Sequence, residues 1–208
     1  MSSEIRREPR WPGVVAMIAA GCVYASLPEP LSVGPSWGLL AVIVLLLIPV
    51  SVSHARERYD VAHLLAFAVN GAIMLAMIAS LVFLIQGLPK HTEPPQTLLR
   101  SAAALWVTNI LVFALWYWKL DGGGPLGRET GRGKWKRSFL FPQMMPGGDT
   151  SWTPEFMDYL FLAFNTSTAF SPTDTAVLSR WAKAGMMLQA LISLSILALL
   201  AARAVNIL

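Results

Sequence analysis

Five long apolar runs limit how this chain can fold more than any other feature of its sequence. They occupy residues 11–27, 37–53, 61–88, 98–120 and 183–208. A helix of about 20 apolar residues is long enough to cross the hydrocarbon core of a bilayer, which is about 30 Å thick. The sequence therefore predicts an all-α, polytopic membrane protein with five transmembrane helices.

The composition supports a membrane protein and excludes several other classes. Hydrophobic residues make up 55% of the 208 residues and charged residues only 13%, whereas soluble domains carry roughly 25% charged residues. The net charge of +4 needs no nucleic-acid partner, because basic loops facing anionic lipid headgroups account for it. The single cysteine, Cys22, excludes an internal disulfide framework. Membrane lipids are the partners that this composition predicts.

The basic residues of the loops predict an orientation. The N-terminus holds Arg6, Arg7 and Arg10, the second loop holds Arg56 and Arg58, and the fourth loop holds most of the remaining loop charge. Cytoplasmic loops are enriched in lysine and arginine. We therefore expect the N-terminus and these two loops in the cytoplasm, with the C-terminus on the opposite side.

This pattern divides the chain into three parts. Residues 1–118 are expected to form a four-helix transmembrane region, and residues 119–150 a basic, glycine-rich and flexible linker at the surface. Residues 151–208 then form a C-terminal module with a polar interruption between two apolar segments. No secretory cleavage site is convincing near the N-terminus, so the first helix is expected to stay in place.

A shorter apolar segment precedes the last span. In "SWTPEF", Thr153 can cap a helix, Pro154 suits the first helical position and Glu155 suits the positive end of the helix dipole. A helix over residues 154–166 would rise roughly 20 Å, and "STAFSPTD" would then break it before it completes a span. The segment is therefore predicted to be a re-entrant half-helix followed by a loop.

The run "MDYLFLAFNTSTAFSPTDTAVLSRWAKAGMMLQALISLSILALLAARAVNIL" resembles the pore module of the potassium-channel superfamily. The similarity covers about a quarter of the chain. It implies a pore helix over residues 159–166, a filter over 167–173, an acidic residue at Asp174 and an inner helix over 183–208. It also implies self-association around a path for small cations, with a tetramer as the assembly by analogy. The whole chain resembles bacterial inner-membrane proteins of unassigned function, which implies the bacterial inner (plasma) membrane.

The filter region departs from the potassium pattern. Potassium filters use glycines so that backbone carbonyls can line the axis, whereas "STAFSPT" has no glycine and contains Pro172. We therefore expect a channel that is weakly selective for cations and not potassium-selective.

The predicted orientation also brings the loop in from the cytoplasmic side, opposite to a potassium channel.

Two groups of residues are the candidate site. The filter-like residues are Thr166, Ser167, Thr168, Ala169, Phe170, Ser171, Pro172, Thr173 and Asp174. Gln189, Ser193 and Arg203 share one face of the last helix. The alternative is that these side chains cap a broken helix or seal an interface. The protein would then be a non-conducting scaffold or a small-molecule carrier.

The remaining polar residues predict no catalytic centre. Asn70 and Asn109 lie within apolar runs, where an amide usually bonds to another helix. His54, His63 and His91 are scattered, and no Ser-His-Asp set can be assembled. We expect no enzyme activity, no metal site and no cofactor.

Overall fold

The computed structural model describes residues 8–55, 59–87, 94–130, 137–148, 152–168 and 174–205, and this part of the chain is mostly helical. Its α-helices are α1 (Trp11–Ala25), α2 (Gly38–Ala55), α3 (Tyr59–Gly87), α4 (Pro95–Leu120), α5 (Gly124–Thr130), α6 (Phe156–Thr168) and α7 (Arg180–Val205). Short 3-10 helices occupy Glu29–Leu31, Asp121–Gly123 and Pro142–Met144, and two-residue strands are β1 (Phe139–Leu140) and β2 (Ala176–Val177). The prediction of an all-α protein is confirmed.

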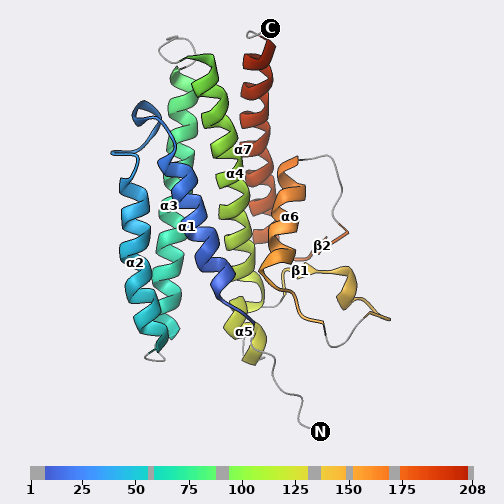
Figure 1. The fold of residues 1–208 in the computed structure, drawn as a ribbon. Helices are drawn as coiled ribbons and strands as arrows, with labels where there is room; N and C mark the ends of the chain where they lie inside the picture. Colours follow the sequence, from blue (N-terminus) through green and yellow to red (C-terminus); the bar gives the residue numbers. More distant parts are fainter. Residues whose placement is uncertain are drawn as a thin grey trace.

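The long helices form an up-and-down bundle with α4 at its centre (Figure 1). Helix α4 packs against α1, α3, α6 and α7, while α2 packs on α1 and α3. The start of α1, the end of α2, the start of α3 and α5 lie at one end of the bundle, which we call the linker end, and the end of α7 lies at the other, the far end (Figure 1).

In the part of the chain that the structure describes, three helical segments are long and apolar enough to cross a membrane: Leu64–Gly87, Gln96–Glu129 and Arg180–Ala202. The apolar helices at Trp11–Ala25 and Gly38–Pro49 are shorter. At 1.5 Å per residue, the 15 residues of α1 rise about 22 Å, which is less than a bilayer core of about 30 Å. The chain is thus compatible with an integral membrane protein, and three of the five predicted spans have the length that a crossing needs.

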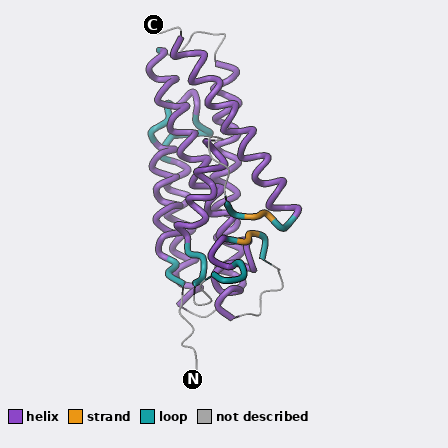
Figure 2. Tube along the Cα trace, turned by 90° about the vertical axis from the view of Figure 1, so that its right-hand side faces the viewer, coloured by secondary structure: helices purple, strands orange, loops and turns teal. Residues whose placement is uncertain are grey.

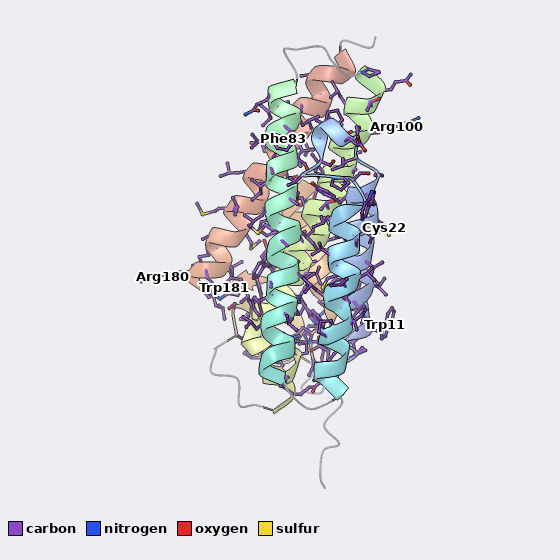
Figure 3. The ribbon with its side chains drawn as sticks, turned by 90° about the vertical axis from the view of Figure 1, so that its left-hand side faces the viewer. Trp11, Cys22, Phe83, Arg100, Arg180 and Trp181 are labelled. Atoms are coloured by element: carbon purple, nitrogen blue, oxygen red, sulfur yellow. The ribbon has the colours of Figure 1, made fainter. Side chains whose placement is uncertain are left out.

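The ends of the long helices carry charged and aromatic side chains. Figure 3 shows Arg180 pointing away from the bundle at the start of α7, with Trp181 beside it, and Arg100 near the far end. Trp11 is exposed at the start of α1, and the exposed Cys22 also points outward (Figure 3). Arginine and tryptophan side chains favour the boundary between lipid tails and water. The apolar section of the bundle thus lies between two polar ends.

Small residues allow α1 to approach its neighbours closely. A Cβ atom built on Gly13 would collide with the Trp118 ring of α4, and one built on Gly21 would lie 2.8 Å from Ile43 of α2. Ala16 and Ala20 of the same helix are buried. Close backbone approach at small residues is a common way for helices to pack where lipid removes the hydrophobic driving force.

The described part of the linker contains short helical and strand segments. Helix α5 follows α4 directly, and β1 pairs antiparallel with β2, with Phe139 opposite Val177. Phe139 is fully buried, and its ring contacts Tyr117 and Tyr159 edge-on. The two strands lie beside the linker-end half of the bundle (Figure 2). Burial of aromatic side chains stabilises this fold of the linker against the helices.

Helix α6 begins two residues later than the sequence predicts. The carboxylate of Asp158 accepts a hydrogen bond from the backbone N–H of Glu155 (2.7 Å), and the Asp158 N–H donates to the Glu155 carbonyl (3.0 Å). Glu155 thus precedes the first helical residue, Phe156, and the Asp158 carboxylate binds its backbone as the acidic residue of a capping box does. Pro154 therefore precedes the helix and does not occupy its first position.

A polar cluster at the end of the half-helix

Helix α6 is a half-helix that stops beside two full-length helices. Its 13 residues rise about 20 Å, and its C-terminal end lies part-way along α4 and α7 (Figure 1). The helix ends at Thr168, where the sequence changes from mainly apolar residues to serine, threonine and proline. The last turn of a helix leaves backbone carbonyls without intrahelical partners, so this end needs hydrogen-bond donors.

Gln189 of α7 makes two hydrogen bonds to the C-terminal part of α6. Its Nε2 donates to the Ala163 carbonyl (2.7 Å) and to Ser167 Oγ (2.8 Å). Its Oε1 accepts a hydrogen bond from the Tyr117 hydroxyl (2.6 Å). The Gln189 side chain is fully buried, and both ends of its amide are paired. It therefore connects α4, α6 and α7.

Ser193 lies one turn further along α7 and binds the same end of α6. Its hydroxyl donates to the Ser167 carbonyl and accepts from the Trp106 indole N–H (3.1 Å). Trp106 also contacts Phe164 edge-on, with ring centroids 6.0 Å apart. The hydroxyl is thus placed by an aromatic side chain that is itself packed on α6.

Asn109 completes the cluster from α4. Its Nδ2 donates to the Gln189 carbonyl (3.3 Å) and to Ser167 Oγ (3.4 Å). The Gln189 carbonyl needs a donor, so the amide nitrogen of Asn109 faces it. Among the described residues, Oδ1 of Asn109 has no hydrogen-bond partner. Asn109, Ser167, Gln189, Ser193, Tyr117 and Trp106 are together called the polar cluster below.

Side-chain donors reduce the negative potential at the end of α6. Unpaired carbonyls give a helix C-terminus about half a negative charge. Here Thr168 Oγ1 donates to the Asn165 carbonyl (3.1 Å), and Ser193 binds the Ser167 carbonyl. Two carbonyls of the last turn thus have side-chain donors within one chain.

The structure places the candidate site residues in three groups. Thr166, Ser167 and Thr168 form the last turn of α6, and Gln189 and Ser193 point toward that turn. Asp174 is exposed at the start of the segment that leads to β2. Ala169, Phe170, Ser171, Pro172 and Thr173 lie outside the described residues, and so does the side chain of Arg203 in α7. The two predicted groups thus meet at Ser167.

The comparisons with known proteins add nothing to this geometry. No protein-family model, no curated protein and no solved structure matches the chain. The resemblance to a channel pore therefore stays a prediction.

Sequence reasoning missed the aromatic members of the cluster. Trp106 and Tyr117 lie three residues before and eight residues after Asn109, so the three share one face of α4 at the period of a helix. The helical period could therefore have predicted that these three side chains share a face. Tyr117 is fully buried and binds Gln189 of α7, and the next residue, Trp118, is also buried.

The two amides within apolar runs behave as predicted. Asn70 Nδ2 donates to the Val112 carbonyl of α4 (3.4 Å), and Asn109 binds α6 and α7. Both are interhelical contacts. Among the described residues, no three His, Cys, Asp or Glu side chains are grouped as a metal site would require.

Proposed function

We propose that the protein is an integral membrane protein of the bacterial inner membrane with a pore loop, and that several copies assemble around a path for small cations. Helix α6 would act as the pore helix, the residues after it as a filter with weak selectivity, and α7 as the inner helix. A single re-entrant loop per chain requires several chains around an axis to enclose a pore.

The observation that carries this proposal is the half-length of α6. A helix that stops beside two full-length apolar helices would place the end of its backbone within the membrane. Non-helical backbone is tolerated there only inside protein or beside a water-filled cavity. The outer faces of α6 and α7 are apolar and exposed, with Phe161, Met187, Leu191 and Leu194 each more than half exposed. Neighbouring copies have room to pack there.

A second candidate function is favoured by the polar cluster. Ser193 and Thr168 donate to the Ser167 and Asn165 carbonyls at the end of α6 within one chain. These side chains take the place that an ion or a water molecule would have at those two carbonyls. The protein would then be a non-conducting scaffold or a small-molecule carrier, with the half-helix as a packing device.

Ion flux and stoichiometry together test the two proposals. The purified protein is reconstituted in liposomes, and cation flux is followed with an entrapped indicator under potassium and sodium gradients, with protein-free liposomes as the control. Chemical cross-linking in the same liposomes counts the chains. Flux of both cations from an oligomer supports the channel. A folded protein that passes no cation under any gradient or voltage contradicts it and leaves the scaffold.

A further inference from the structure

The segment before α1 is joined to the linker end by an interior ion pair. One oxygen of the Glu8 carboxylate accepts hydrogen bonds from Nη2 and Nε of Arg128 in α5, at 2.8 Å and 3.2 Å. The other oxygen accepts one from the Trp118 indole N–H of α4. The side chains of Glu8 and Arg128 are only 7% and 4% exposed. Both charges are therefore held away from water, and each neutralises the other.

A second contact fixes the backbone of this segment. The Glu129 carboxylate of α5 accepts the Glu8 backbone N–H (2.7 Å) and pairs with Arg10 (3.3 Å). The Arg10 side chain is 32% exposed, and an ion pair that is open to water stabilises a protein little. The position of residues 8–10 therefore depends mainly on the interior pair.

The two side chains that bind the Glu8 carboxylate both reach the first turn of α6. The guanidinium of Arg128 lies over the Tyr159 ring, 5.2 Å from the centroid, a geometry that attracts a cation to the ring. The Trp118 ring contacts Phe156 edge-on, with centroids 5.6 Å apart. Glu8 is thus one side chain away from α6 by either route.

Tyr159 also joins α6 to the linker strand β1. Its hydroxyl donates to the buried carboxylate of Asp121 (2.7 Å). That carboxylate accepts the backbone N–H groups of Ser138 and Phe139 as well. Arg128 reaches the same place, since its Nη1 donates to the Asp121 carbonyl (2.8 Å). A displacement of Arg128 therefore affects α6 and β1 together.

The interior pair is expected to open as a unit. If Glu8 alone leaves, Arg128 stays behind as a buried cation whose Nε and Nη2 have lost the carboxylate. Leaving one partner of a buried ion pair unpaired is strongly unfavourable, and that cost is avoided when both charges reach water. Arg128 should therefore turn toward water when Glu8 leaves, and the Tyr159 ring then loses the cation.

We propose that residues 8–10 form a two-state strap that holds the base of α6. In the fastened state Glu8 and Arg128 are both buried, and the guanidinium lies on the Tyr159 ring. In the released state both charges are in water, and α6 loses that contact. Arg128 is then a positioning residue, through which the segment before α1 acts on the half-helix. The strap concerns the conformation of the linker end and does not depend on whether the protein conducts ions.

Hydrogen–deuterium exchange of the full chain in lipid nanodiscs tests the strap with three variants: Glu8→Leu, Arg128→Met and the two combined. Each single variant leaves one charge of the pair without its partner. Amides in the first half of α6, and the Phe139 amide that binds Asp121, should then exchange at least about tenfold faster than in the wild type. The double variant should exchange no faster than Arg128→Met, because the two residues act as one unit.

Two controls separate release of the strap from a general loss of stability. Glu29→Leu removes an exposed acid at the α1–α2 connection and should leave exchange unchanged. Amides in the middle of α3 should keep their wild-type rate in all variants, since α3 makes none of the contacts described for the strap.

Three results would overturn the strap. One is an unchanged exchange rate in α6 for Glu8→Leu. Another is an equal rise in α6 and in α3, which would mean that the variants only destabilise the whole bundle. The third is a double variant that exchanges much faster than Arg128→Met, because the two residues would then act independently. Comparison of Arg128→Met with the double variant keeps the test decisive if Glu8→Leu fails to fold.

Discussion

The amide nitrogen of Gln189 lies 2.8 Å from Ser167 Oγ and joins the middle of α7 to the last turn of α6. The contact is fully buried, and it is the point at which the two groups of candidate residues meet. Its role differs between the two proposed functions. In a channel the contact would hold the pore helix in register with the inner helix. In a scaffold it would serve only to pack α6 against α7.

Replacement of Gln189 by leucine should destabilise the protein. The variant Gln189→Leu removes three hydrogen bonds and leaves the Tyr117 hydroxyl buried without its acceptor. Leaving one buried polar group unpaired costs about 1–3 kcal/mol. The melting temperature in detergent should therefore fall, while Gln96→Leu, at an exposed position at the start of α4, should change it little. Equal melting temperatures for the two variants would contradict the role of Gln189.

Two serines on α7 give a second matched pair. Ser193→Ala loses the bond to the Ser167 carbonyl and the acceptor of the Trp106 indole. Ser195→Ala loses only a bond to the Leu191 carbonyl of its own helix, at an exposed position. We expect Ser193→Ala to lower the free energy of unfolding by about 1–2 kcal/mol and Ser195→Ala by less than about 0.5 kcal/mol. Chemical unfolding in mixed micelles measures both, and a larger effect of Ser195→Ala would exclude this account.

The local features of the candidate site could be predicted from sequence because they depend on neighbours along the chain. The polar interruption after α6 and the shared face of Gln189 and Ser193 are read from helical periods and from turn-forming residues. The direction in which that face points could not be predicted. A period shows that side chains share a face, but the neighbouring helix that the face meets is set by packing of the whole bundle.

The contacts at the linker end lie beyond sequence reasoning for a different reason. Glu8 and Arg128 are far apart in the chain, and neither lies in a repeated pattern. Glycines and charges in the linker predicted a flexible surface loop, but Asp121 and Phe139 are fully buried there. A buried carboxylate that accepts several hydrogen bonds can order such a loop, and its partners appear only when the helices are packed.

Glycines of α1 and α3 should respond in opposite directions to substitution by alanine. A Cβ atom at Gly13 meets the Trp118 ring, whereas nothing lies within 4 Å of a Cβ atom at Gly71. Gly13→Ala should therefore cost about 1–3 kcal/mol through overpacking, while Gly71→Ala should stabilise α3 by up to about 1 kcal/mol. Thermal unfolding of the two variants decides the matter, and stabilisation by Gly13→Ala would show that α1 and α4 are not in close contact.

Cysteine labelling in intact cells tests the proposed orientation. In a Cys22→Ser background, Gln143→Cys reports the linker end of the bundle. Glu29→Cys reports the opposite side, at the connection between α1 and α2, and both positions are exposed. If the basic linker end faces the cytoplasm, a membrane-impermeant maleimide should label Glu29→Cys and not Gln143→Cys. The reverse pattern would mean that the orientation is that of a potassium channel.

The charge of Asp174 gives a direct test of the proposed ion path. Asp174 is exposed and is the last of the filter-like residues, and several copies around an axis would concentrate cations at the mouth of the pore. Asp174→Asn should lower cation flux by roughly tenfold at about 10 mM salt, where the screening length is about 30 Å, and much less at about 1 M. Glu29→Gln, an exposed acid at the α1–α2 connection, is the matched control and should leave flux unchanged. If Asp174 only orders the loop, asparagine retains its hydrogen-bonding ability. Flux that is present but equally insensitive to both variants at low salt would therefore remove Asp174 from the ion path.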